Sequence, residues 1–453
     1  MKADGAAAST YTGASASAST SVSARPAYRD ANVLRWLVAY TASITGDVVY
    51  FLALTWAAVR VGGPSQVGLV VAAGALPRAV LMLGGGVVAD RFGPRRVAVV
   101  SDAVRCAVIL GAAAALTLAS PGVWLLVTVA LVFGAVDAVF MPAVGALPPL
   151  IAAPAQFARV QGMRGLSIRL SNAVGPLLAA AVLVTAGAAG AFAAAGILFA
   201  LSLATLLTVR TLSPASSARP PRSASARAST RVSALRELAD GLRYVRRHRM
   251  LAPLVVVIGL GEMCFSGPVA TGLVLLAEER GWGAPGMGWI ASAFSVGAAA
   301  SALLLTVSAR IPRAGLVMCA ALLVTAGGAV ALGRVASLPL AVLLGCLIGL
   351  TSGITTTVTG ALLQTETDPR YLGRVTAVTT LCTLGLAPVL FPAVGVTVAL
   401  WGADAFFAGC GVICLLAAGL GLAVPVLRRA ELQGPETLSP VAVAGGSGVP
   451  SEG

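Results

Sequence analysis

The chain has 453 residues, of which 58% are hydrophobic and only 11% are charged, and its formal net charge is +14. Apolar runs of about twenty residues recur along most of it, and each can cross the roughly 30 Å of hydrocarbon in a bilayer as a helix. These features exclude a soluble globular domain. Because the arginines lie in short connections between the runs, they indicate membrane topology rather than nucleic-acid binding.

The amino-terminal segment, residues 1–32, is rich in Ala, Ser and Thr and lacks the apolar core of a signal peptide, so it predicts a disordered cytoplasmic tail. Twelve predicted spans follow at 33–59, 66–89, 97–118, 123–148, 162–186, 190–209, 251–277, 286–309, 314–333, 337–363, 374–400 and 404–427. The runs are continuous rather than alternating, which predicts helices, the form that satisfies its own backbone within lipid. The predicted fold class is therefore an all-α polytopic membrane protein with twelve transmembrane helices.

The spans form two groups of six. Residues 33–209 are the predicted N-terminal bundle, residues 251–427 the C-terminal bundle, and residues 428–453 a second disordered cytoplasmic tail. Between the bundles, the linker 210–250 contains ten arginines. Its apolar residues recur at helical spacing: Val232, Leu235, Leu238, Leu242 and Val245. This pattern predicts an amphipathic helix that lies on the anionic inner leaflet, or a solvated helix between the two halves.

The arginines also orient the chain. With the amino terminus in the cytoplasm, 25 of the 31 basic residues fall on one side of the membrane, and three fall on the other. Such an excess is typical of cytoplasmic loops. Thirty arginines against one lysine indicate a GC-rich bacterial genome. We therefore expect a multi-pass protein of the bacterial inner membrane with both termini in the cytoplasm.

The two bundles resemble each other at a constant offset of 215 residues. Gly46-Asp47 in the first span returns as Gly261-Glu262 in the seventh, and the segment 154–160 before span 5 returns as 369–375 before span 11. In register, these matches indicate a duplicated six-helix unit. Parallel repeats related by an axis along the membrane normal are a known transporter architecture.

A charged stretch, GGGVVADRFGPRRVAVVSD at 84–102, covers the end of the second span, a tight turn and the start of the third span. It resembles the signature G-x-x-x-D-R-x-G-R-[KR] of the major facilitator superfamily through Gly86, Asp90, Arg91, Gly93, Arg95 and Arg96, with Pro94 where many members have Arg. With the six-plus-six layout and the basic central loop, the resemblance covers residues 33–427. It implies two pseudo-symmetric six-helix bundles and transport by alternating access.

Finer features are similar to the macrolide-efflux-like branch of drug:proton antiporters. These are Gly46-Asp47 in span 1, Asp102-x-x-Arg105 in span 3 and FMPAVGALPPLI at 140–151. Span 5 carries Gly175-Pro176, as in the antiporter signature, although Ala179-Ala180 replace the usual glycine pair. The branch also exports siderophores and other natural products, so the resemblance implies export without fixing the substrate.

Charged residues within the spans are costly, at about 2.5–3.5 kcal/mol each, and therefore suggest function. Asp47 and Glu262 lie midway along spans 1 and 7, and by the repeat they face each other across a central cavity. A carboxyl group in such an apolar site can take up and release protons near neutral pH. We expect one or both to couple proton uptake to substrate release; the alternative is a permanently paired structural charge.

Five further charged positions and one polar run accompany them. Arg78 in span 2 is a candidate partner of Asp47, and Asp137 in span 4 is another candidate partner or protonation site. Asp102 and Arg105 are expected to form an intrahelical salt bridge. Arg169 in span 5 serves an anionic substrate or pairs with Asp102 or Asp137. The run TSGITTTVTG at 351–360 either lines a cavity or bonds to its own helix.

The signature after span 2 is expected to act as a gate. By the resemblance, Asp90 holds the two halves together in the outward-facing state, with the N-terminal end of span 11 after Gly373-Arg374 as its partner. Gly84, Gly85 and Gly86 are expected to allow close helix approach. Arg91, Arg95 and Arg96 are expected to anchor the loop in the cytoplasm.

The favoured function is proton-coupled efflux of small amphipathic or hydrophobic organic compounds, such as a drug, antibiotic or natural product. Alternatives are a siderophore or metabolite exporter, a nutrient importer or facilitator, or a membrane sensor that moves nothing. The chain has a single histidine, and its seven cysteines include no CxxC pair, so we expect no metal site. It also contains no P-loop, HExxH or GxSxG constellation, so we do not expect an enzyme. The expected partners are a small-molecule substrate, protons and lipid, with no nucleic acid and no cofactor, and the expected state is a monomer.

Overall fold

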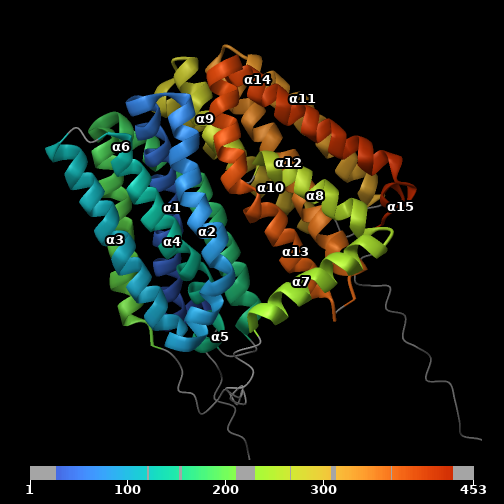
Figure 1. Ribbon diagram of the computed structural model, residues 1–453, viewed down its shortest axis with the longest axis horizontal. Coiled ribbons are helices and arrows are strands. Elements are labelled where there is room, and N and C mark those ends of the chain that lie inside the picture. The colour runs from blue at the N-terminus through green and yellow to red at the C-terminus, as the bar shows by residue number, and fades with distance from the viewer. Residues whose placement is uncertain are drawn as a thin grey trace, which may run out of the picture.

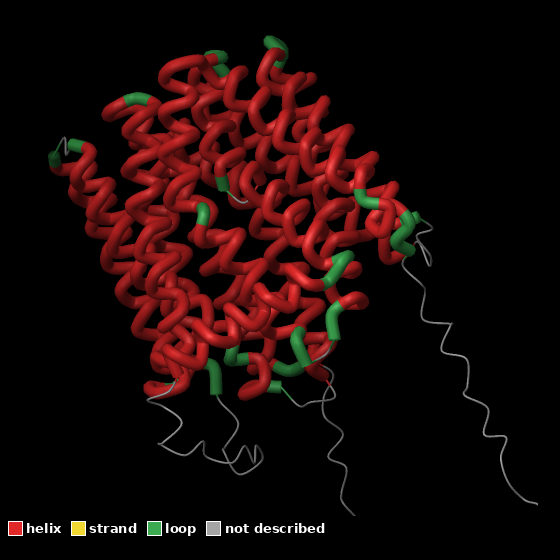
Figure 2. Tube along the Cα trace, turned by 45° about the vertical axis from the view of Figure 1, so that its right-hand side comes forward, coloured by secondary structure: helices red, strands yellow, loops and turns green. Residues whose placement is uncertain are grey.

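A computed structural model describes residues 27–119, 122–152, 156–210, 230–265, 267–307, 313–368 and 370–431, and within these ranges it contains helices and no strand (Figures 1 and 2). Ten of the described helices are long and apolar enough to cross a membrane. Two of them, α6 (Phe157–Thr208) and α14 (Ala387–Ala423), each reverse at a glycine of positive φ, Gly187 at 64° and Gly402 at 82°. The described chain therefore makes twelve crossings, and the all-α polytopic fold is confirmed.

The first six crossings form the N-terminal bundle. Its elements are η1 (Ala27–Arg29), α1 (Ala31–Gly62), α2 (Pro64–Phe92), α3 (Pro94–Leu118), α4 (Val123–Gly145), the short α5 (Pro148–Ile151) and α6. The chain then enters α7 (Thr230–Arg247), which runs along the lower side of the C-terminal bundle in Figure 1. The expected tails at 1–32 and 428–453, and linker residues 211–229, lie almost entirely outside the described residues.

The C-terminal bundle contains the other six crossings. Its elements are α8 (Leu251–Phe265), α9 (Pro268–Glu279), α10 (Gly283–Val307), α11 (Ala314–Arg334), α12 (Leu338–Glu366), α13 (Leu372–Gly385), α14 and the short α15 (Pro425–Arg428). We call the end of the bundles that carries α7 and the α2–α3 connection the linker end. The opposite end, with the turns at Gly187 and Gly402, is the far end.

Two of the predicted continuous spans are broken in the C-terminal bundle. Span 7 divides into α8 and α9 before Pro268, where Gly267 has a φ of 154°. Span 11 divides into α13 and α14 at Leu386, two residues before Pro388. Proline lacks the N–H that a helix needs and disfavours helical backbone in the residue before it. Both breaks lie in mid-molecule in Figure 2, whereas the other loops lie at the ends of the helices.

The two bundles touch backbone to backbone near the far end. A Cβ atom at Gly68 of α2 would lie 2.8 Å from the carbonyl oxygen of Phe391 on α14, and one at Gly395 would lie 2.6 Å from that of Pro64. On the other flank, a Cβ at Gly288 of α10 would lie 2.9 Å from the carbonyl oxygen of Pro176 on α6. Small residues of this kind let membrane helices approach closely. The far end of the molecule is therefore closed in this structure.

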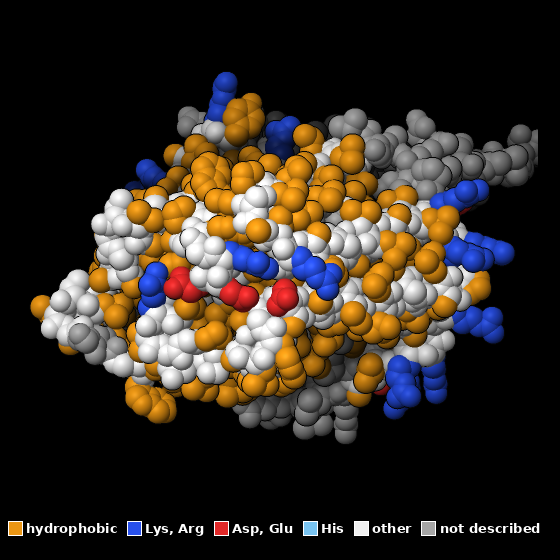
Figure 3. Space-filling model, turned by 90° about the horizontal axis from the view of Figure 1, so that it is seen from above, with side chains coloured by type: hydrophobic (Ala, Val, Ile, Leu, Met, Phe, Trp, Pro, Cys, Tyr) orange, Lys and Arg blue, Asp and Glu red, His pale blue; other side chains and the backbone are white. Residues whose placement is uncertain are grey.

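Charges at the far end also join the bundles. Arg60 of α1 pairs with Glu278 of α9 at 3.6 Å, which links the two bundles. Within the C-terminal bundle, the neighbouring Glu279 accepts a 2.8 Å hydrogen bond from the amide of Ala403, directly after the reversal of α14. Figure 3 looks onto this end, where acidic and basic side chains gather near the centre of an otherwise apolar surface. Because the Arg60–Glu278 pair is largely exposed, we attribute most of the closure to the backbone contacts.

A leucine at Gly68 is expected to prevent this closure, because its side chain has no room against Phe391 and Pro392. We expect Gly68→Leu to lower transport at least several-fold and to expose a cysteine placed at the buried Val67 to a membrane-impermeant maleimide. Gly111→Leu is the matched control, since a Cβ at Gly111 meets open space. Unchanged labelling in Gly68→Leu would contradict the tight seam.

The linker helix packs on α8 and α13 of the C-terminal bundle. Val245 of α7 is buried, and Tyr244 stacks on Tyr371, with ring centroids 4.3 Å apart. A Cβ at Gly241 would lie 3.0 Å from the carbonyl oxygen of Arg374 on α13. Within residues 239–247, part of the apolar side therefore packs on protein, whereas Leu242 of the same side is exposed. The expected position on the membrane surface stays a prediction. The side chains of 230–238 are outside the described set.

Candidate functional site

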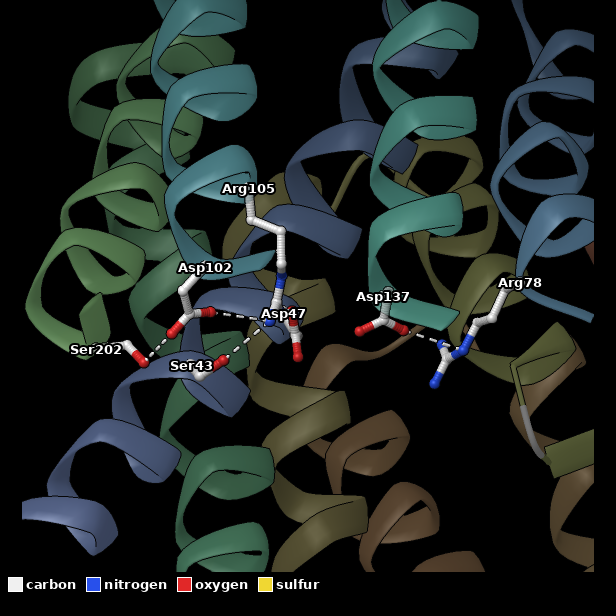
Figure 4. A network of polar contacts seen from close by, with 7 residues as sticks. All are labelled: Ser43, Asp47, Arg78, Asp102, Arg105, Asp137 and Ser202. Atoms are coloured by element: carbon white, nitrogen blue, oxygen red, sulfur yellow. Dashed lines mark hydrogen bonds and ion pairs between the residues drawn. The ribbon is translucent and has the colours of Figure 1, made fainter. Parts of the chain in front are cut away.

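Three charged side chains meet inside the N-terminal bundle (Figure 4). Arg105 of α3 donates through Nη2 to Oδ1 of Asp47 on α1 and through Nη1 to Oδ1 of Asp102, at 3.2 Å. The same Nη1 donates to Ser43 Oγ at 3.1 Å, and Ser202 Oγ donates to Asp102 Oδ2 at 2.5 Å. We call these five residues the charge network. It ties together α1, α3 and the second segment of α6.

Local helix geometry and aromatic packing hold Arg105 in place. Asp102 and Arg105 are three residues apart and so share one face of α3, which confirms the expected intrahelical pair. Three aromatic rings surround the guanidinium, those of Phe133, Phe140 and Phe199, with centroids 5.0, 4.3 and 4.4 Å from Cζ. Each such contact contributes about 0.5–2 kcal/mol. The rings exclude water, so Arg105 depends on its two carboxylates for charge compensation.

A second ion pair lies beside the charge network. Arg78 of α2 pairs with Asp137 of α4, with Nε 3.1 Å from Oδ2, and Figure 4 shows it on the opposite side of Asp47 from Ser202. The expectation that Arg78 pairs with Asp47 is therefore wrong. Residues at similar depth meet only if their helices also turn them toward each other. Here α2 packs along α4, and α4 supplies the carboxylate.

The three aspartates differ in their access to solvent. The side chain of Asp47 is 21% exposed, whereas those of Asp102 and Asp137 are 0% and 5% exposed. Together they offer three carboxylates to two guanidiniums, so one proton makes the set electrically neutral. Among the three, Asp47 is the group placed to exchange that proton with water.

The remaining intramembrane charges lie elsewhere. Arg169 of α6 is exposed, and its Nη1 donates to the carbonyl oxygen of Ala298 on α10 at 3.3 Å. Its expected pairing with Asp102 or Asp137 is therefore wrong, because both carboxylates are held by other arginines. Glu262 lies on α8, but its side chain is outside the described set, so its predicted role stays a prediction.

The residues of the gating signature lie at the linker end. Gly93, with a φ of 87°, is the single residue between α2 and α3. Arg95 donates through Nη2 to the carbonyl oxygen of Leu207 at 2.7 Å, while Arg91 lies over the ring of Phe92 and Arg96 is exposed. The expectation of close helix approach is wrong at Gly86, because a Cβ there meets open space. Gly84 and Gly85 lie outside the described side chains.

Asp90 is exposed at the end of α2, and no hydrogen bond or ion pair joins it to another described residue. The lock with span 11 is thus absent from this structure, in which the far end is closed. We expect Asp90→Asn to cripple transport while leaving insertion and melting temperature unchanged, because the lock forms only in the opposite state. Transport and thermal melting of the purified protein test this. The control is Glu366→Gln, an exposed acid at the same end; normal transport by Asp90→Asn would refute the lock.

The antiporter-like pair of span 5 lies against the charged helix α1. A Cβ at Gly175 would lie 2.7 Å from Val48 Cγ1, directly after Asp47, and Pro176 is buried within α6. In α12, the hydroxyls of the polar run donate to carbonyl oxygens of their own helix, at 2.8–3.2 Å. Of the two readings of this run, the structure therefore bears out back-bonding.

Sequence reasoning missed the residues that complete the charge network. Ser43 and Ser202 are buried polar side chains, at 0% and 1% exposure, and the aromatic rings around Arg105 come from α4 and α6. One signal was present: Ser43 lies four residues before Asp47 and so shares its helix face. Nothing in the local sequence pairs Ser202 with Asp102, a hundred residues earlier.

Comparison with known proteins assigns the fold to a family. Solved structures with this fold include a peptide transporter, POT, in complex with sulfate (TM-score 0.67, 14% identity, covering 88% of this chain and 96% of that one). Another is an inward-facing bacterial homologue of the iron transporter ferroportin (TM-score 0.66, 15% identity, covering 86% of this chain and 98% of that one). A third is the nucleoside transporter NupG (TM-score 0.61, 14% identity, covering 87% of this chain and 98% of that one). Comparison with curated protein sequences gives no match. The family model of the Major Facilitator Superfamily matches residues 36–284 and 263–444, so the chain belongs to this superfamily of transporters.

Proposed function

We propose that this transporter exports small amphipathic organic compounds across the bacterial inner membrane in exchange for protons. The observation that carries the proposal is the charge network, in which the partly exposed Asp47 shares the buried Arg105 with Asp102. A carboxylate held this way has two stable states. It is either ionised and paired with Arg105, or protonated and released from it.

The network connects protonation to helix contacts. When Asp47 takes up a proton, its attraction to Arg105 falls, while Asp102 keeps the guanidinium on α3 through its fixed intrahelical position. The tie between α1 and α3 is then weakened. Because α1 also packs along α6, a change at Asp47 reaches the surface that faces the C-terminal bundle. Proton binding thereby biases the equilibrium between the two bundle arrangements.

In this proposal the N-terminal bundle binds protons and the C-terminal bundle contributes an apolar wall to the substrate site. The buried ion pairs all lie on spans 1–4 of the N-terminal bundle, whereas the described side chains at mid-depth of the C-terminal bundle carry no charge. An apolar wall suits the hydrophobic body of an amphipathic substrate, since polar nutrients need a denser set of hydrogen-bonding side chains. The arginine excess supports a cytoplasmic linker end.

Transport in reconstituted vesicles tests the proposal. Vesicles carrying the protein and an internal pH dye receive lipophilic drugs in turn, with and without an imposed pH gradient. A substrate is expected to accumulate against its own gradient when protons run the opposite way, and its addition is expected to move protons in the absence of an imposed gradient. Uptake driven in the same direction as protons would favour an importer instead. No proton movement with any transported compound would overturn the exchange.

A further inference from the structure

One intramembrane arginine has no carboxylate partner among the described side chains. Arg78 and Arg105 are each paired with at least one aspartate, whereas Arg169 contacts only the neutral carbonyl oxygen of Ala298, at 3.3 Å, among the described residues. That oxygen already accepts a hydrogen bond from Ser301 Oγ at 2.8 Å. An unpaired guanidinium within the membrane is costly, so a bound counter-charge would stabilise it.

Arg169 lies in the seam between the bundles rather than against lipid. Its hydrogen-bond acceptor is on α10 of the opposite bundle. It stands twelve residues after the start of α6, which is about 18 Å along the helix axis. A residue that only marks the cytoplasmic end of a span would lie much closer to the start of the helix.

The contact between α6 and α10 changes along the seam. Near the far end the two helices meet through small residues, since a Cβ at Gly288 of α10 would lie 2.6 Å from the Cβ of Ala180 on α6. Ten residues further along α10, at Ala298, the contact is made by the side chain of Arg169. The Arg169 side chain is exposed there.

Two more arginines precede Arg169 on the same helix. Arg159 and Arg164 are five residues apart and Arg169 follows after five more, so each step rises about 7.5 Å. Arg159 is exposed, and Arg164 donates through Nε to the hydroxyl of Tyr40 at 3.1 Å. Within the described residues, no carboxylate pairs with any of the three. The first segment of α6 thus carries three positive charges at successive depths, but each step of five residues also turns the side chain by about 140°. Arg164 accordingly faces α1, whereas Arg169 faces α10.

We propose that Arg169 binds the acidic group of an amphipathic organic anion. The planar guanidinium fits a carboxylate, sulfonate or phosphate through paired hydrogen bonds. The long, shared contact with Ala298 is readily exchanged for such a group. The inference rests on the proposed export function and narrows its substrates to those with one negatively charged end.

Equilibrium binding tests the site without any proton gradient. The purified protein in phosphatidylcholine nanodiscs is titrated with two fluorescent probes, 12-(dansylamino)dodecanoic acid and its primary amide, and empty discs supply the background. Wild type is expected to bind the acid about 10- to 100-fold more tightly than the amide, as befits a charge-assisted hydrogen-bonded pair. Equal affinities for the two probes would overturn the proposal.

Variants assign the preference to Arg169. Arg169→Gln is expected to weaken binding of the acid to the level of the amide while leaving the amide unchanged, which also shows that the variant is folded. Arg169→Lys keeps the charge and is expected to retain part of the preference. The control is Arg35→Gln, which removes an exposed arginine of α1. A full acid preference in Arg169→Gln would refute the site. Because the binding measurement uses no proton gradient, its outcome does not depend on whether the protein exchanges protons in vesicles.

Discussion

Asp47→Asn is expected to abolish transport driven by a pH gradient, because the amide keeps the size of the side chain but cannot bind or release a proton. Asparagine still accepts a hydrogen bond from Arg105, so the packing of α1 against α3 is preserved. We expect active accumulation of substrate in vesicles to fall at least 100-fold. Exchange of labelled for unlabelled substrate, which needs no proton movement, is expected to continue.

The separation of these two activities distinguishes a coupling residue from a structural one. A purely structural role for Asp47 predicts that both activities fall together with the melting temperature. The control is Asp240→Asn, which removes an exposed carboxylate whose ion-pair partner among the described residues is Arg243 of the same helix, at 3.5 Å. Gradient-driven accumulation by Asp47→Asn at the wild-type rate would eliminate Asp47 as the coupling group and direct attention to Glu262.

The sequence predicts the helices well because their determinant is local. A run of about twenty apolar residues satisfies the bilayer wherever it occurs, so the number of crossings follows from hydropathy alone. Hydropathy does not predict the helix breaks at Gly267 and Leu386, because it counts apolar side chains and carries no information on backbone conformation. The Gly267-Pro268 pair and Pro388 carried that information.

The pairing of charges is a different problem, since it depends on how each helix is rotated. Asp47 is sixteen residues into α1 and Arg105 is eleven residues into α3, a difference in height of about 7 Å that an arginine side chain can span. Depth therefore permits the pair but does not select it. Arg78 is at a suitable depth for Asp47 too, yet the packing of α2 on α4 gives it Asp137. Only the three-dimensional packing decides between them.

Removal of Arg105 is expected to destabilise the protein more than any other single change in the charge network. Its side chain is fully buried, and without it Asp102, which is also fully buried, loses its only cationic partner among the described residues. Truncation of one partner of a buried pair costs about 3–5 kcal/mol, because an uncompensated charge remains. We expect Arg105→Met to melt well below wild type in detergent, as followed by fluorescence-detected size exclusion after heating.

The double variant Arg105→Met with Asp102→Asn tests the reason for that loss. The neutral amide introduced by Asp102→Asn removes the stranded charge, so the double variant is expected to be more stable than Arg105→Met alone even though it carries one more substitution. Arg35→Met, at an exposed position, should melt as wild type does. If the double variant instead melted lower than the single one, the dominant contribution of Arg105 would be its packing among Phe133, Phe140 and Phe199 rather than charge compensation. Packing against the rings would then be what holds the arginine, and protonation of Asp47 would change the contact between α1 and α3 little.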